Sequence, residues 1–164
     1  MTEACNIRKF ESRDLPRLHE VREAAFRPIF RSFRSIVGEE IAPIALAGLE
    51  SEQADYLDKI CGSESDHEVY VVEEGAEIMA FCAVALDHKT KLGEIDLNAV
   101  DPEHQGRGVG ARMYAFVLDR MKDAGMRVAT VGTGGDPSHA PARRAYEKAG
   151  FGAVIPSVYM YRSL

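Results

Sequence analysis

The strongest constraint on the fold of this chain is a glycine-rich segment, Gln105-Gly106-Arg107-Gly108-Val109-Gly110, that follows a strand-like stretch and precedes a helix-like one. Alternating glycines leave main-chain N–H groups uncovered and permit backbone conformations that other residues avoid. The helix start adds N–H donors without intrahelical partners and a partial positive charge. The segment therefore predicts a cradle for phosphate oxygens. A tight strand–helix turn is the alternative, although three alternating glycines exceed what a turn requires.

The same glycines also satisfy the dinucleotide-binding pattern G-x-G-x-x-G/A, through Gly106, Gly108 and Ala111. Three features disfavour this interpretation. The pattern lies in the second half of a 164-residue chain, with too little sequence after it to complete such a sheet. The strand that leads in, 94–100, alternates polar and apolar side chains, whereas buried parallel strands are almost continuously apolar. Where an acidic ribose ligand is expected about 20 residues on, 132–135 reads Gly-Thr-Gly-Gly.

The bulk composition fits one globular domain, which we expect to span 1–164. A hydrophobic content of 46% supports a full core, and a net charge of −6 disfavours general binding to nucleic acid or membrane surfaces. There is neither an apolar run of roughly 18 residues nor the apolar core of a signal peptide. Cys5, Cys61 and Cys82 lack metal or redox spacing, so we expect idle thiols, no metal and a cytoplasmic location.

Hydrophobic periodicity predicts an α/β (α+β) domain in which helices cover a sheet. Strands are expected at 6–10, 68–73, 77–86, 94–100 and 127–131, and two short terminal strands near 151–155 and 157–162. A first helix is expected from Leu15, and Pro28 is expected to start or bend a second segment of it. Further helices are expected over 42–60, with a weak point at Gly48, from Val109 to a cap at Gly125, and over 138–149.

Two blocks at a fixed separation carry a resemblance to a known family. Gln105-x-x-Gly108-x-Gly110 is similar to the pyrophosphate motif Q/R-x-x-G-x-G/A of the GNAT N-acyltransferase superfamily. The second block, from Ala142 to Phe151, resembles the A-x-x-x-Y-x-x-x-G-F helix and exit of that family. One block alone is a weak signal. Both blocks together, at the separation usual for the family, extend the resemblance over essentially all 164 residues.

The resemblance implies a central sheet of about six to seven mostly antiparallel strands, flanked by about four helices. It also implies an N-acetyltransferase that uses acetyl-CoA as donor and works by direct attack of a primary amine. Such a reaction needs a base for the amine, a donor to the carbonyl oxygen and an acid for the departing thiolate.

For the acid, the resemblance places Tyr146 near the thioester sulfur, where a phenol with an ordinary pKa of about 10 can protonate the thiolate. Packing of the ring between helix and sheet is the alternative.

Glu94 matches a position where some members hold a general base, and Asp96 is a weaker candidate. An ordinary solvated strand face is the alternative, since strand alternation predicts one shared face for Glu94, Asp96 and Asn98.

For the cofactor, the resemblance implies that the main chain at Asn98, Ala99 and Val100 pairs with the pantetheine arm. An N–H near Asn98 would polarise the thioester carbonyl, and simple sheet pairing is the alternative. Tyr146 and Ala142 are expected to contact the cofactor, and the pyrophosphate would be held by Gln105, Gly106, Arg107, Gly108, Val109, Gly110 and Ala111. The Arg107 side chain is expected to add charge.

His139 departs from the family pattern, because many members carry Asn seven residues before the tyrosine. Either His139 makes a similar cofactor contact, or Ser138 caps the helix and the contact is lost. We favour a capped helix with His139 near the cofactor.

No motif specifies the acceptor. One stripe of a predicted helix is basic and consists of Arg27, Arg31 and Arg34. It would attract an acidic acceptor, but we favour its interpretation as an ordinary solvated helix face. A second stripe is interpreted as core or a homodimer contact rather than an aromatic substrate site: Phe26, Phe30 and Phe33. A small-molecule amine is the first candidate acceptor and a protein α-amine or lysine is the second. A non-catalytic acyl-CoA sensor is the rival class.

Overall fold

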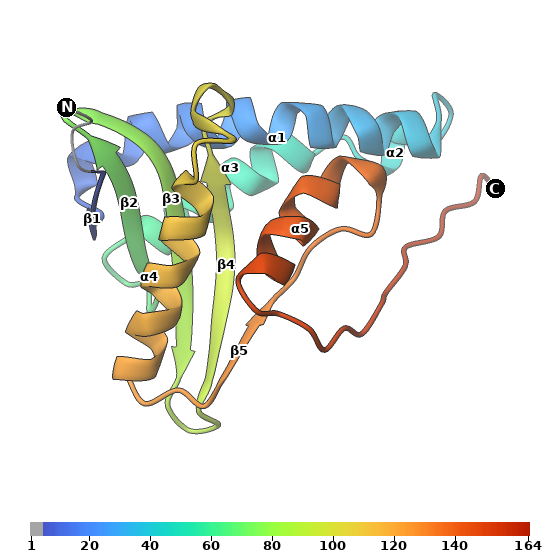
Figure 1. Ribbon diagram of the computed structural model, residues 1–164. Helices are drawn as coiled ribbons and strands as arrows, with labels where there is room; N and C mark the ends of the chain where they lie inside the picture. The colour runs from blue at the N-terminus through green and yellow to red at the C-terminus, as the bar shows by residue number, and fades with distance from the viewer. Residues whose placement is uncertain (1–4) are drawn as a thin grey trace.

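The computed structural model describes residues 5–164, and five strands of this region form one sheet in the order β1-β2-β3-β4-β5 (Figure 1). The strands are β1 (Asn6–Lys9), β2 (Glu68–Glu74), β3 (Glu77–Asp87), β4 (Leu92–Val100) and β5 (Val128–Val131). The first four pair antiparallel, and β5 pairs parallel to β4. The predicted mixed, mostly antiparallel sheet is confirmed, with fewer strands than expected.

Helices cover both faces of this sheet (Figure 1). On one face lie α1 (Leu15–Val37) and α3 (Leu49–Cys61), over a core that includes Leu18, Leu57 and Phe81. On the other lie α4 (Val109–Asp123) and α5 (Ala140–Lys148), over a core that includes Met113, Val117 and Tyr146. The sheet separates these two cores, and the cavity described below lies where β4 and β5 diverge.

Two helical predictions need adjustment. Pro28 neither ends α1 nor starts a new helix, because α1 runs on through it to Val37. A proline inside a helix removes one hydrogen bond. Packing of α1 against the sheet and α3 outweighs that loss. The stretch 42–60 divides into the one-turn α2 (Ala42–Ala45) and α3, and the break ends at Gly48, the predicted weak point.

The two predicted terminal strands are wrong, and the strand number falls accordingly from about six or seven to five. After α5, Phe151 packs against Tyr146 with ring centroids 6.0 Å apart, and the chain then runs in an extended path away from the sheet (Figure 1). Its apolar side chains are exposed, with Ile155 96% and Met160 89% accessible. Pro156 lies between the two expected strands, and proline cannot donate to a strand ladder.

Strand β4 carries a β-bulge where it pairs with β3. Cys82 lies opposite Asn98 and Val84 lies opposite Ile95, so residues 96–97 of β4 face the single residue Ala83. An extra residue in one strand shifts the alternation by one position, so that later side chains emerge on the opposite face.

The bulge separates polar side chains that strand alternation predicted to lie together. Asp96 is hydrogen-bonded to Tyr56 of α3 on one face of the sheet. Asn98 is hydrogen-bonded to Tyr114 of α4 and Tyr146 of α5 on the other. The prediction of one shared face for Glu94, Asp96 and Asn98 is therefore wrong.

Strand β4 is also open along part of one edge. It pairs with β5 only from Leu92 to Ile95, opposite Val128 to Val131. Beyond that point β5 diverges from β4 (Figure 1), and no strand within residues 5–164 covers that edge over 96–100. Free main-chain groups on such an edge are suited to pair with an extended ligand.

Candidate active site

The glycine-rich loop forms an open cradle at the N-terminus of α4. Gly106 and Gly108 have φ of 75° and 78°, a region that favours glycine, and an added Cβ at either would meet nothing within 4 Å. The first helical hydrogen bond is donated by Arg112 N to Gly108 O at 3.1 Å. The N–H groups of the first turn before Arg112 lie outside the helical ladder and are free to bind an anion. Gly110 differs, since it has no positive φ.

Side chains around the loop hold it in place. Gln105 donates from Nε2 to the carbonyl of Val100 at 3.2 Å, which ties the loop to the end of β4. Arg107 is directed to Glu74 of β2, at 3.2 Å, and lies 2.8 Å from Nδ1 of His104. These contacts engage the Arg107 guanidinium on the side of Glu74, and its contribution of charge to the cradle stays a prediction.

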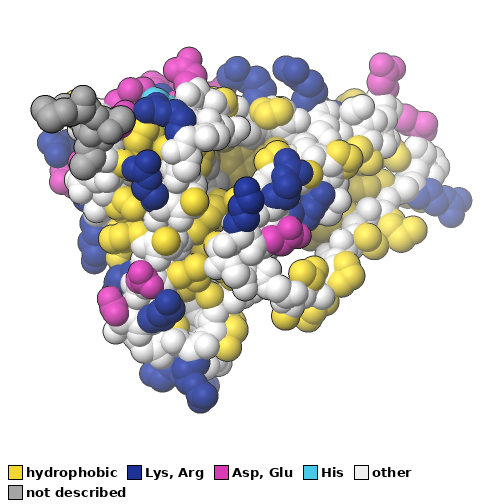
Figure 2. Space-filling view, viewed as in Figure 1, with side chains coloured by type: hydrophobic (Ala, Val, Ile, Leu, Met, Phe, Trp, Pro, Cys, Tyr) yellow, Lys and Arg dark blue, Asp and Glu magenta, His cyan; other side chains and the backbone are white. Residues whose placement is uncertain are grey.

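A cavity of about 1030 Å³ extends from this cradle along the open edge of β4 to α1 and α3. It brings together all the predicted site residues except Arg107, namely Glu94, Asn98, Ala99, Val100, Gln105, Gly106, Gly108, Val109, Gly110, Ala111, His139, Ala142 and Tyr146. Figure 2 shows this face hollowed, with apolar side chains inside and basic ones near the opening. Arg144 and Lys148 of α5 are among the lining residues.

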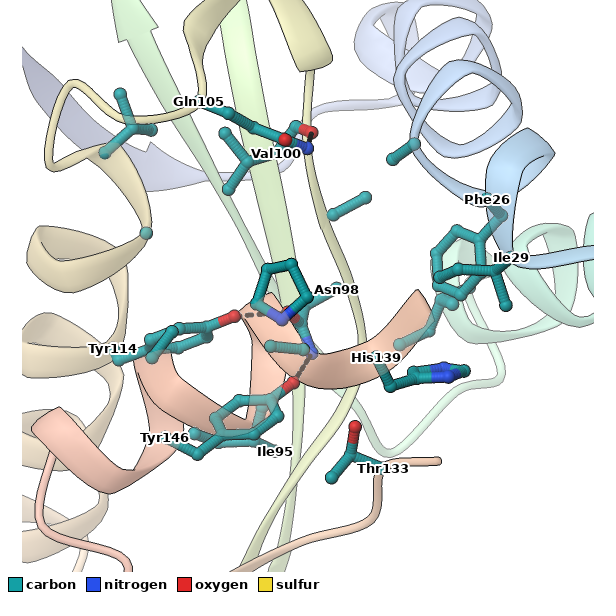
Figure 3. A pocket seen from close by; sticks show the side chains of 18 of the residues that line it. Phe26, Ile29, Ile95, Asn98, Val100, Gln105, Tyr114, Thr133, His139 and Tyr146 are labelled. Carbon is teal, nitrogen blue, oxygen red and sulfur yellow. Dashed lines mark hydrogen bonds between the residues drawn. The ribbon is translucent and has the colours of Figure 1, made fainter. Parts of the chain in front are cut away.

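Three side chains form a hydrogen-bonded group inside the cavity (Figure 3). Asn98 donates from Nδ2 to the hydroxyl of Tyr146 at 3.1 Å, and its Oδ1 accepts from the hydroxyl of Tyr114 at 2.9 Å. Burial raises the pKa of Tyr146, while the hydrogen bond from Asn98 acts in the opposite direction. The net shift is upward, so the phenol is neutral at pH 7 and can act as an acid.

On the other face of β4, the two candidate bases differ in their contacts. Asp96 Oδ2 accepts a hydrogen bond from Tyr56 and lies 2.8 Å from Nε2 of His67. Glu94 is exposed and lines the cavity, and its carboxylate has no hydrogen-bonding partner within residues 5–164. Glu94 is therefore the carboxylate free to accept a proton, whereas Asp96 is held by two neighbours.

The segment before α5 places His139 in the cavity wall. Its Nδ1 lies 2.5 Å from Asp136 Oδ1, and its ring stacks on Phe33 of α1 with centroids 5.7 Å apart. Asp136, not Ser138, caps this turn by accepting from the N–H of Ser138 at 3.0 Å. Burial raises the pKa of Asp136, but hydrogen bonds from Ser138 and His139 outweigh that effect and lower it.

The helix stripes of α1 also have defined positions. Arg27 lies 3.8 Å from Glu23, and Arg34 is bound by Glu50 at 2.6 Å, which fits the solvated helix face. Phe30 is buried, as expected for core, but Phe26 lines the cavity.

Cys5, Cys61 and Cys82 are free thiols. No helix of the described region is both long and apolar enough to cross a membrane.

Sequence reasoning missed three residues at this site: Tyr56, His67 and Tyr114. Tyr114 had a usable signal, since it follows Gly110 by one helical turn and so shares its face of α4. Tyr56 and His67 had none, because they reach Asp96 from a helix and a loop that are remote in sequence.

Comparisons with known proteins show the family and the fold to which this chain is similar. Residues 26–151 match the model of the acetyltransferase (GNAT) family. A mycothiol acetyltransferase of Sanguibacter keddieii is 31% identical over 97 residues, which cover 56% of this chain and 30% of that protein. The chain thus matches less than a third of the length of this curated relative.

Two solved structures share the fold. A GNAT acetyltransferase from Brucella melitensis, in complex with acetyl-CoA, is 22% identical, with a TM-score of 0.64 over 92% of this chain and 84% of that one. The ribosomal-protein-S18-alanine N-acetyltransferase of Escherichia coli is 18% identical, with a TM-score of 0.65 over 93% and 80%. Since the family model covers most of the sequence, this chain belongs to the acetyltransferase (GNAT) family.

Proposed function

We propose that this protein transfers an acetyl group from acetyl-CoA to the primary amine of a small molecule, by direct attack. The observation that carries the proposal is the single cavity in which the glycine cradle, the open edge of β4 and the buried hydroxyl of Tyr146 meet. Each of these supplies one requirement of acyl transfer from a thioester.

The donor side fits acetyl-CoA. Gly106 and Gly108 leave open space above the loop, where an anion can approach the N–H groups at the start of α4. The edge of β4 over 96–100 offers main-chain groups to the amide-bearing pantetheine arm. The Brucella melitensis structure, which holds acetyl-CoA, lends support to this assignment.

The reaction follows from the groups in the cavity. Glu94 accepts a proton from the amine, directly or through water, and the nitrogen then attacks the acetyl carbonyl carbon. A main-chain N–H near Asn98 stabilises the negative charge that builds on the carbonyl oxygen. As the carbon–sulfur bond breaks, Tyr146 donates its hydroxyl proton to the sulfur and later regains one from water.

The shape of the acceptor end favours a small amine over a polypeptide. Phe33 of α1 stacks on His139, and Ser32 reaches Asp136 at 3.4 Å, so α1 is bound to the segment before α5. This bridge ties together two walls of the cavity, since Phe26 and Ile29 of α1 and His139 before α5 all line it. A cavity whose walls are tied together in this way is better suited to a compact acceptor than to a polypeptide.

The test is release of free CoA thiol from acetyl-CoA by the purified protein, across a panel of small amines and two peptides, one with a free α-amine and one with an internal lysine. We expect release with at least one small amine. Tyr146→Phe should slow it by about 100-fold, within the range for loss of a general acid.

The panel also separates the rival functions. Release with a peptide alone would favour a protein acetyltransferase. CoA binding without release across the whole panel would reject the enzyme in favour of a non-catalytic acyl-CoA sensor.

A further inference from the structure

The side-chain amide of Asn98 has one orientation that satisfies all its neighbours. Besides the two tyrosines, its Nδ2 reaches the main-chain carbonyl of Asp96 at 2.9 Å. A carbonyl oxygen only accepts hydrogen bonds, so the NH₂ group must face Asp96 and the oxygen must face the other way. The network therefore fixes the amide, which distance alone does not.

This orientation sets the direction of every hydrogen bond in the group. The oxygen of Asn98 points at Tyr114, so the Tyr114 hydroxyl must donate. The second N–H of Asn98 points at Tyr146, so the Tyr146 hydroxyl must accept. Burial raises the pKa of both phenols, so both keep their protons at neutral pH.

These hydrogen-bond directions determine whether the hydroxyl proton of Tyr146 has an acceptor within the protein. Its hydroxyl oxygen accepts from Asn98, and the neighbouring Tyr114 hydroxyl lowers the pKa of Tyr146, which is the effect of a second donor. Within residues 5–164 the geometry gives Tyr146 no hydrogen bond in which it is the donor. Tyr146 is only 7% exposed, yet it lines the cavity, so that hydrogen is available to a group inside the cavity rather than to bulk water.

We infer that Asn98 is a positioning residue that keeps the hydroxyl proton of Tyr146 free for the departing thiolate. An acceptor at this position would take that proton into a hydrogen bond and hold it away from the sulfur. The bulge in β4 is part of the arrangement, because it moves Asn98 to the face of the tyrosines and exposes the Asp96 carbonyl to its amide. This inference rests on the proposed acetyl transfer and on Tyr146 as its acid.

The test replaces the donor by an acceptor of nearly the same shape, in Asn98→Asp, alone and with Tyr146→Phe. We expect Asn98→Asp to lower kcat for thiol release by about 10- to 100-fold, within the range for general acid catalysis. The dissociation constant for CoA should stay within about twofold, because the proton is used after binding. In the Tyr146→Phe background, Asn98→Asp should change kcat by less than about twofold, because residues acting as a unit are not additive.

Two further variants serve as controls for the role of Asn98. Asn98→Leu removes donor and acceptor together and leaves the Tyr146 proton free, so its loss of kcat should be smaller than that of Asn98→Asp and should also vanish beside Tyr146→Phe. This variant keeps the test open if Asn98→Asp does not fold. Tyr70→Phe deletes another buried hydroxyl, bound to Glu68 at 2.7 Å outside the cavity, and should leave kcat unchanged.

Equal fold losses of kcat for Asn98→Asp with and without the Tyr146 hydroxyl would overturn the inference alone, since Asn98 would then act independently of that proton. A wild-type kcat for Tyr146→Phe would overturn the proposed acid and this inference together. Coupled losses, with unchanged CoA binding, would support both.

Discussion

The hydroxyl of Tyr56, on α3, donates a hydrogen bond to the carboxylate of Asp96, on the bulge of β4. Burial, this bond and the charges of Asp96 and Glu94 together raise the pKa of Tyr56 to about 12. We expect a tyrosinate absorbance titration, taken as the difference between wild type and Tyr56→Phe, to show a midpoint near 12. Asp96→Asn should lower that midpoint, because it removes a negative charge next to the phenol. An unchanged midpoint would mean that Asp96 does not contact Tyr56 in solution.

Glu94 and Asp96 provide a matched pair for identifying the base. Glu94→Gln should lower kcat for acetyl transfer by about 10- to 100-fold, because it removes the unpaired carboxylate of the cavity. Asp96→Asn should lower it less, because Asp96 is already held by Tyr56 and His67. Initial rates at saturating acetyl-CoA and amine measure both. A larger loss in Asp96→Asn would reverse the assignment.

Gly108 and Gly125 lie at the two ends of α4 with nearly equal φ, 78° and 82°, and with open space around an added Cβ. Replacing either by alanine should lower the free energy of unfolding by about 1 kcal/mol, through strain at positive φ. Gly108→Ala should also weaken CoA binding by more than tenfold, because its methyl group enters the phosphate cradle. Calorimetric titration with CoA tests this. Equal binding by the two variants would contradict the location of the cradle.

The Arg8–Asp14 pair links β1 to the start of α1. Both Asp14 oxygens accept from Arg8, at 2.7 Å and 3.0 Å, and Asp14 is 5% exposed. These bonds from Arg8, opposed by burial and helped by the N–H of Glu11, hold the pKa of Asp14 below its usual 3.8. Asp14→Asn should lower the free energy of unfolding by about 2 kcal/mol at pH 7.

The pH dependence of that loss has a defined sign. Because the pKa of Asp14 is lower in the folded state, its contribution is complete above the unfolded value of 3.8 and is lost as the pH falls through the folded value. The stability difference from wild type should therefore shrink below about pH 3.8 in urea titrations. Asp119→Asn is the control, since its pair with Lys122 at 3.1 Å is exposed and should contribute less than about 1 kcal/mol. A constant difference down to low pH would exclude the ionic contribution.

Much of the donor side was predictable because it depends on local chemistry. The glycine positions required a special backbone before a helix, and Gly106 and Gly108 show it. The spacing of Tyr146 from Gly150 and Phe151 placed the tyrosine on a helix against the sheet, as observed. The family model confirms the resemblance drawn from these two blocks.

The arrangement around β4 was not predictable, because it depends on pairing between strands. Simple alternation placed Asn98 beside Asp96, and only the register against β3 reveals the bulge that separates them. The contacts of Asp96 with Tyr56 and His67 arise from packing of distant segments, for which the sequence contains no periodic signal.

The C-terminal prediction failed for a related reason. Residues 151–162 are rich in the β-branched and aromatic side chains of strands, but such a composition indicates only that a segment could pair, not that an edge is available. The neighbouring edge strand β5 is four residues long, and its Val128 remains 61% exposed.

Because β4 contains an extra residue, the arrangement of the site depends more on the number of residues in this strand than on their identity. Deleting Leu97 would restore an unbroken ladder with β3 and would leave Asn98 opposite Cys82, on the face of the tyrosines, because Asn98 would then follow Ile95 by two positions. The sheet would lose little pairing, yet the Asp96 carbonyl would enter the regular ladder, and the hydrogen bond that it accepts from the Asn98 amide would be lost. Substitutions at 97 that keep an apolar side chain should be tolerated during evolution, whereas loss of one codon there should free the Asn98 amide and lower turnover while leaving a folded protein.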